Sequence, residues 1–409
     1  MMRPCFGATG SWALEGMALS DCLARIDERD AAVRGWVHID RSAQGGAGPL
    51  AGLVLGVKDV IDVAGMPTTH GSPIYADHRA LADATSVARL RAAGAVVLGK
   101  TVTAEFATYH PGPTANPRNL AHTPGGSSSG SAAVVADGQA DFALGTQTAG
   151  SVIRPASFCG TLGFKPTFGR YPLGGVLETA PSLDTLGLFA RNLAVLGAAD
   201  AVLAQDSASP IAVSTLTIGL CRSPLWSLAS APMMDAFLAF AAGLQAADHC
   251  VIDIELPAPF AWLSAAQALI HRREAALMLG YIRRDHPAQV SAAFAAMIDQ
   301  GEAEKEADYQ AALALQRKCT ALCPEVFAQA DLLLVPGAPG TAPAGLSATG
   351  DPAFQRIWTA IGVPCLGFPA AWGADGLPLG LQIIAAPGTD RQLFANAPAI
   401  LAHAAFREI

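Results

Sequence analysis

Short apolar runs alternate with longer segments of helical periodicity along most of the chain. The short runs predict buried strands at residues 53–57, 95–99, 140–146, 217–221, 251–255, 331–336 and 379–385. Apolar residues at helical spacing predict helices at residues 20–33, 85–94, 232–247, 262–284, 304–329 and 390–403. Strands that are apolar throughout must be covered on both faces, so the alternation indicates an α/β fold with one sheet between layers of helices.

The composition is that of a large compact protein whose partners are small molecules. Of the 409 residues, 51% are hydrophobic and 15% are charged, and no polar linker or internal repeat divides the chain. The net charge of −8 and the lack of a Lys/Arg cluster argue against nucleic acid as a partner. No apolar run reaches the ~18 residues needed to span a bilayer, so we expect no membrane partner either.

The cysteines indicate neither a disulfide framework nor a metal site, because they are scattered and form no CxxC pair. Cys319 and Cys323 would be neighbours on a helix, but no histidine or second pair completes a set of metal ligands. We therefore expect free, mostly buried thiols, no metal and no cofactor. The first twenty residues lack the apolar stretch of a signal peptide, so a reducing cytoplasm is the expected location. The cysteines are Cys5, Cys22, Cys159, Cys221, Cys250, Cys319, Cys323 and Cys365.

A serine-rich tract at residues 123–138 reads TPGGSSSGSAAVVADG. Gly/Ser tracts are often flexible linkers, but here an apolar run follows the serines, and a linker would not carry one. Gly138 stands where a glycine commonly ends a helix. The tract therefore predicts the start of a buried helix, with Ser127 or Ser128 near its N-cap.

Residues 94–101, GAVVLGKT, match the phosphate-loop pattern G-x-x-x-x-G-K-[ST]. A phosphate loop needs a strand before the first glycine and a helix after the Lys-Thr pair. Here a predicted helix precedes Gly94, and the four residues after it read as a strand. ATP binding through Lys100 is therefore not expected.

A second pattern, GSSSG at residues 126–130, matches the nucleophile elbow G-x-S-x-G with Ser128 at its centre. An elbow must leave a strand, and the preceding HTPGG is poor strand material. A hydrolase triad would also need downstream Asp and His residues, and none of His271, His286 and His403 lies in a recognisable loop setting. An α/β-hydrolase mechanism stays as an alternative.

A serine nucleophile needs a base and a set of oxyanion donors. Lys58, one of five lysines, follows the apolar run LVLGV, where burial would favour its neutral, basic form. A buried lysine paired with an acid is the competing interpretation. Downstream, the loop from Thr146 to Ser151 consists of small residues and can present several consecutive backbone N–H groups to one point, as a tetrahedral oxyanion requires.

Three blocks of the sequence together resemble the amidase signature family of Ser–Ser–Lys amide hydrolases. They are residues 48–69 (GPLAGLVLGVKDVIDVAGMPTT), the serine-rich tract, and residues 144–170 (LGTQTAGSVIRPASFCGTLGFKPTFGR). The resemblance spans most of residues 45–190 and much of 331–400. It implies a single domain with a central mixed sheet covered by helices, divided into an N-terminal helical segment (1–45), a catalytic core (46–200), a variable helical region (205–325) and a C-terminal return to the core (330–409).

The resemblance also implies roles for individual residues. Ser151 matches the nucleophile of the family, Ser127 its bridging serine and Lys58 its general base, and the family has a cis peptide bond beside the bridging serine. The implied oxyanion donors are the amides of Thr148, Ala149, Gly150 and Ser151. Many members have glycine where this chain has Ala149, and an alanine there is harmless only if its φ is negative.

Within the family, the chain looks most like the malonamidases, which hydrolyse a small dicarboxylic half-amide. This likeness implies Arg154 and Ser128 as substrate-binding residues, and a structural ion pair is the competing role for Arg154. Three alternatives stay open: a biuret-type amide hydrolase, a component like glutamyl-tRNA amidotransferase A, and a member that has lost catalysis. A small-molecule amide is the expected partner, and a homodimer is compatible with the sequence.

Overall fold

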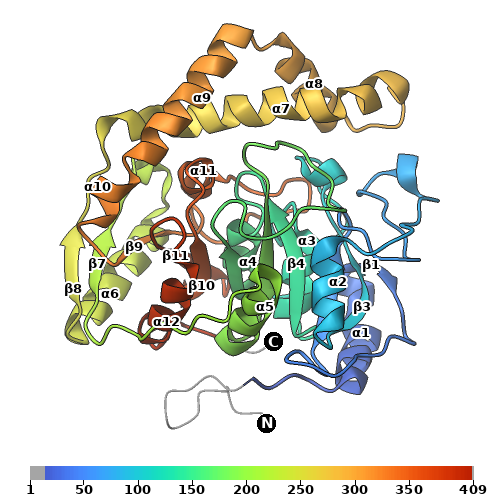
Figure 1. The fold of residues 1–409 in the computed structure, drawn as a ribbon, viewed down its shortest axis with the longest axis horizontal. Helices are drawn as coiled ribbons and strands as arrows, with labels where there is room; N and C mark the ends of the chain where they lie inside the picture. The colour runs from blue at the N-terminus through green and yellow to red at the C-terminus, as the bar shows by residue number, and fades with distance from the viewer. Residues whose placement is uncertain (1–13, 408–409) are drawn as a thin grey trace.

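The computed structural model describes residues 14–407, and within them eleven strands form one sheet (Figure 1). The strand order is β1-β3-β2-β4-β6-β5-β10-β11-β9-β7-β8. The strands are β1 (Trp36–Ile39), β2 (Val54–Lys58), β3 (Val96–Thr101), β4 (Phe142–Gln147), β5 (Leu162–Lys165), β6 (Thr185–Ala190), β7 (Thr217–Leu220), β8 (Cys250–Asp253), β9 (Leu332–Pro336), β10 (Cys365–Trp372) and β11 (Pro378–Ile384).

The sheet is mixed. Strand β2 runs parallel to both β3 and β4, and β7 runs parallel to both β8 and β9. The strands between these two groups pair antiparallel, from β4 through β6, β5, β10 and β11 to β9. The predicted α/β fold with a central mixed sheet is therefore confirmed.

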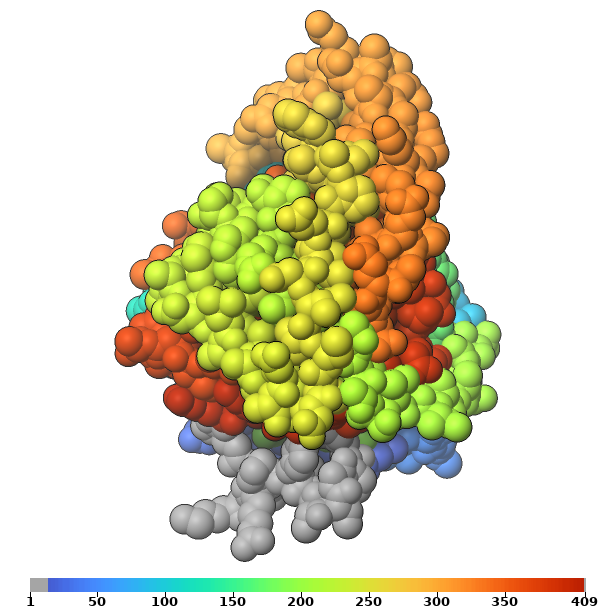
Figure 2. Space-filling model, turned by 90° about the vertical axis from the view of Figure 1, so that its left-hand side faces the viewer, coloured from blue at the N-terminus to red at the C-terminus, as the bar shows by residue number. Residues whose placement is uncertain are grey.

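Helices pack on the sheet and over the ends of its strands. Three of them, α7, α8 and α9, lie together at one end of the molecule in Figure 1, and this part of the chain also forms the top of Figure 2. The α-helices are α1 (Leu19–Val33), α2 (Thr85–Ala92), α3 (Ser129–Ala136), α4 (Ile153–Cys159), α5 (Leu193–Ala204), α6 (Ala231–Ala246), α7 (Leu263–Asp285), α8 (Ala292–Ala303), α9 (Glu306–Ala321), α10 (Cys323–Phe327), α11 (Ala353–Ala360) and α12 (Asp390–Leu401).

The periodicity found the long elements and missed the short ones. Every predicted strand and helix is present, except that the helix expected over 304–329 divides into α9 and α10, with Pro324 in the first turn of α10. Proline lacks the N–H that would continue the preceding helix. The missed elements are β1, β5, β6, β10, α4, α5, α8 and α11.

The serine-rich tract leads into a buried helix, as predicted. Helix α3 starts after Ser128 at its N-cap, and Gly138 has φ +76° just beyond its end. A side chain at Gly130 would collide with the backbone of Gly35 and Val102. The tract is therefore packed structure, and glycine is required where two other segments approach it.

Two further expectations can be compared with the described residues. The described cysteines are free, and all of them are buried except Cys250, which is exposed, whereas Cys5 lies outside the described residues. Among residues 14–407, no helix has both the length and the apolar character needed to cross a membrane.

Candidate active site

Two parallel strands bring Lys58 and Thr146 together at one edge of the sheet. Lys58 is the last residue of β2, and Thr146 lies near the end of the adjacent strand β4. The Lys58 Nζ donates to Ser127 Oγ at 2.8 Å and to Thr146 Oγ1 at 2.6 Å. The competing interpretation of Lys58 as half of an ion pair is wrong within residues 14–407, because both partners are hydroxyl groups.

Burial controls the charge of this lysine. Lys58 is fully buried, and the loss of solvation lowers its pKa to about 7, against a smaller opposing effect of the carboxylate of Asp184. A lysine with such a pKa is largely neutral at slightly alkaline pH, so its nitrogen has a lone pair that can accept a proton.

Ser127 is held by contacts on both sides of an unusual peptide bond. The bond between Gly126 and Ser127 is cis, as the resemblance implied. The Ser127 carbonyl accepts from the N–H of Ala104 at 3.0 Å, and the Gly126 carbonyl accepts from Arg154 Nη2 at 2.6 Å. A Cβ on Gly126 would lie 2.7 Å from a methyl carbon of Thr349, so only glycine fits before this serine.

Ser151 lies in the loop between β4 and α4. The carbonyls of this loop are all engaged: Thr148 O accepts from Gln267 Nε2 at 2.8 Å, Ala149 O accepts from Thr359 Oγ1 at 2.7 Å, and Gly150 O accepts from the N–H of Arg154 at 3.0 Å.

The amides of the same loop, residues 148–151, donate to no acceptor in the described part of the chain. Ala149 is absent from the described non-glycine residues with positive φ, so its methyl group does not strain the loop. Because the carbonyls are fixed, the four free N–H groups can serve as donors to an oxyanion.

The two serines differ in accessibility. Ser151 is 7% exposed and Ser127 is 1% exposed. The Ser151 hydroxyl makes no hydrogen bond within residues 14–407, whereas Ser127 Oγ accepts from Lys58. Arg154 links the two segments, because it binds backbone atoms of both Gly126 and Gly150. The serine with the free, more accessible hydroxyl is therefore Ser151.

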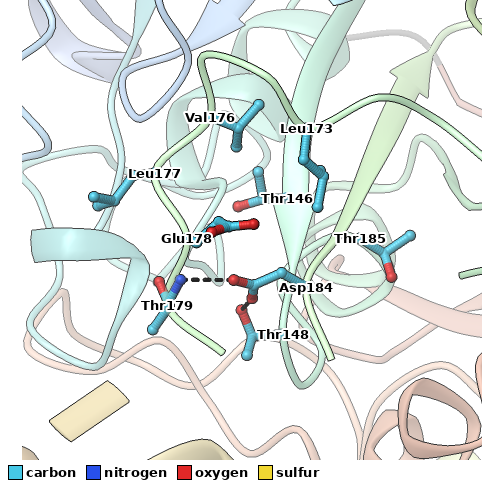
Figure 3. A pocket seen from close by; sticks show the side chains of 9 residues that line it. All are labelled: Thr146, Thr148, Leu173, Val176, Leu177, Glu178, Thr179, Asp184 and Thr185. Atoms are coloured by element: carbon cyan, nitrogen blue, oxygen red, sulfur yellow. Dashed lines mark hydrogen bonds between the residues drawn. The ribbon is translucent and has the colours of Figure 1, made fainter. Parts of the chain in front are cut away.

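Asp184, just before β6, braces the loop. Its carboxylate accepts from Thr148 Oγ1 and from the N–H groups of Thr179 and Ala180, and burial raises its pKa to about 6. Figure 3 shows Asp184 and Thr148 beside a cavity of about 10 Å³, whose wall also includes Thr146. That volume is about what one water molecule needs.

Arg154 is buried without a carboxylate partner. It is 4% exposed, its Nη2 also donates to Thr349 Oγ1 at 3.3 Å, and its Nε and Nη1 have no partner among the described residues. Burial lowers its pKa to about 10, so the guanidinium is still charged at neutral pH. The expected structural ion pair is wrong for residues 14–407, and a buried positive charge near Ser151 is left without an anion.

The remaining sequence candidates lie outside this arrangement. The Ser128 hydroxyl contacts only the backbone of Thr146 in the described residues, at 3.2 and 3.3 Å, so no histidine serves it as an elbow nucleophile. Lys100 lies inside β3 and pairs with Asp59 at 2.8 Å, which confirms that the phosphate-loop match has no structural counterpart.

Several residues of the site carried no sequence signal. Asp184 is one acid among many, and Gln267 and Thr359 come from segments remote from the recognised blocks. Gln147 is also involved: its Oε1 accepts from the N–H groups of Val152 and Ile153 at the start of α4. Only tertiary contact shows that these side chains hold the loop.

Comparisons with known proteins agree with this geometry. The model of the family Amidase matches residues 29–394. A glutamyl-tRNA(Gln) amidotransferase A from Salinibacter ruber is 42% identical over 226 residues, which cover 49% of this chain and 44% of that protein. The matched part is thus less than half of that relative's length. The protein of the same name from a Synechococcus strain is 31% identical over 82% of this chain and 80% of its own.

A solved structure described as an amidase superposes with a TM-score of 0.86 and 29% identity, covering 95% of both chains. The family model spans most of the described residues and the fold agrees over nearly the whole chain. The chain therefore belongs to the amidase signature family of enzymes, which hydrolyse carbon–nitrogen bonds.

Proposed function

We propose that this protein hydrolyses the C–N bond of a small linear amide that carries a carboxylate, through an acyl-enzyme on Ser151. The observation that carries the proposal is the 2.8 Å contact of the buried Lys58 amine with Ser127, next to a loop whose amides are free. No ion pair within residues 14–407 holds this lysine charged, so the amine is available as a base.

The residues act in sequence. Neutral Lys58 takes the proton of Ser127, Ser127 takes that of Ser151, and the Ser151 oxygen attacks the amide carbonyl carbon. The amides of residues 148–151 bind the oxyanion. The proton returns along the same path to the leaving nitrogen, which departs as ammonia. Water then hydrolyses the ester to the carboxylic acid and regenerates Ser151.

The substrate class follows from Arg154. A buried guanidinium without an anion is costly, and its forked N–H groups match a carboxylate. Malonamate, the half-amide of malonic acid, is small enough to place its amide at Ser151 and its carboxylate at Arg154. The role of Ser128 as a second substrate-binding residue stays a prediction, since its hydroxyl is engaged by Thr146.

The alternative is a protein like the relatives named glutamyl-tRNA(Gln) amidotransferase A, favoured by the 31% identity over 82% of this chain. An amidotransferase component of that kind would work together with a partner protein. The two candidates differ in what the purified chain does alone, so the assays below use the isolated protein.

The first prediction concerns the nucleophile. The purified protein should release ammonia from members of a panel of small amides, and Ser151→Ala should lower turnover at least about a thousandfold. The fold should persist, because one hydroxyl without hydrogen-bond partners contributes little to packing. Ser128→Ala is the matched control. An active Ser151→Ala protein beside an inactive Ser128→Ala protein would refute the assignment.

The second prediction concerns the base. Because the lowered pKa of Lys58 is about 7 and the neutral amine is the active form, kcat should rise with pH through about 7 and level off above it. Lys58→Arg should be as inactive as Lys58→Ala, since a guanidinium stays protonated. A Lys58→Arg enzyme with appreciable activity would mean that position 58 supplies only positive charge.

The third prediction concerns Arg154. With malonamate, Arg154→Ala should lower kcat/KM by about 10- to 100-fold, the usual scale for a charged hydrogen bond. A neutral amide of similar size should lose less, namely only what the lost contact with the Gly126 carbonyl contributes. Equal losses on both substrates together with a lower melting temperature would mean that Arg154 has only a structural role.

A further inference from the structure

Three basic side chains near Ser151 carry nitrogen atoms without partners. His271 on α7 is 3% exposed, and neither of its ring nitrogens has a hydrogen-bond partner within residues 14–407. In the same described residues, Arg154 on α4 leaves Nε and Nη1 unpartnered, and Arg356 on α11 leaves its buried Nε unpartnered. Buried polar groups are normally hydrogen-bonded. These three residues, the basic cluster, therefore require an explanation.

The helices that carry the cluster also anchor the Ser151 loop. Gln267, one turn before His271 on α7, donates to one carbonyl of the loop at 2.8 Å. Thr359, one turn after Arg356 on α11, donates to another at 2.7 Å. Residues three or four apart lie on one face of a helix, so His271 and Arg356 lie on the faces turned to the loop. Figure 1 shows α7 passing above α11.

The charges of the cluster act on one another. Burial lowers the pKa of His271 to about 3, and the charge of Arg356 lowers it further. Arg356 also opposes the charge of Arg154, whose pKa is lowered chiefly by burial. His271 is thus neutral, with one N–H donor and one acceptor. Neither guanidinium has a carboxylate within ion-pair distance in the described residues, although Asp351 attracts Arg154 from farther away.

We propose that Arg154, Arg356 and His271 together form the binding site for the carboxylate end of the substrate, which makes Arg356 and His271 specificity-determining residues. The inference rests on the proposed function and extends it from one residue to three. Two guanidinium groups provide charge and forked donors, and the imidazole adds an N–H without a third charge. A neutral amide would leave both positive charges uncompensated, so the site selects anions.

Malonate, the carboxylate counterpart of malonamate, is the probe that tests the site without catalysis. Calorimetric titration of the wild-type protein should show malonate binding, and both Arg356→Gln and His271→Leu should weaken it about tenfold or more, as expected when a hydrogen bond to a charged group is lost. Arg284→Gln is the matched control, because Arg284 is an exposed arginine on the same helix α7. That variant should bind malonate like the wild type.

Equal malonate affinity in the wild type and the two cluster variants would overturn the inference, and so would a wild-type protein that binds no malonate. Ammonia release from a neutral amide, measured in parallel, separates the two proposals: release without malonate binding leaves the hydrolase and removes the carboxylate site. Since neither ring nitrogen of His271 has a partner in the described residues, His271→Leu should not lower the melting temperature. A marked drop together with lost binding would indicate a structural role and count against the inference.

Discussion

The burial of the Lys58 amine among hydroxyl groups is the constraint on which the rest of the site depends. Lys100, at the matching end of the neighbouring strand β3, shows the alternative: it is equally buried, but its amine contacts the carboxylate of Asp59 at 2.8 Å. Burial disfavours the charge of both lysines, and only Lys100 has an acid within hydrogen-bonding distance to oppose that effect. The same residue type thus supports the structure in one strand and is available as a base in the next.

The surrounding architecture serves to keep this amine dry and in register. Parallel pairing of β2 with β4 places Thr146 beside Lys58, and the fitted glycine before Ser127 brings the bridging hydroxyl to the same point. Helices α7 and α11 hold the carbonyls of the loop that follows β4, which leaves its amides free. The C-terminal half of the chain therefore completes a site whose proposed catalytic groups all lie in the first 151 residues.

The sequence was sufficient for the parts that local pattern determines. The α/β class, the long helices and the buried start of α3 followed from periodicity and from Gly138, and the resemblance pointed to Lys58, Ser127 and Ser151. It could not show that Arg154 lacks an ion pair, since that depends on which acids the fold brings near. Asp184, His271 and Arg356 escaped for the same reason: a single acid, histidine or arginine has no signature until tertiary packing buries it. The division of the chain into one domain with four stretches stays a prediction.

The central claim, a buried and neutral lysine, can be measured directly by nuclear magnetic resonance of protein labelled with ¹⁵N-lysine. The chain has only five lysines, and a Lys58→Met variant would assign the signal of interest. The account predicts that the Lys58 amine titrates with a midpoint near its lowered pKa of about 7. A midpoint near the ordinary lysine value of about 10.4 would contradict it, because the amine would then be charged at the pH where the enzyme must accept a proton.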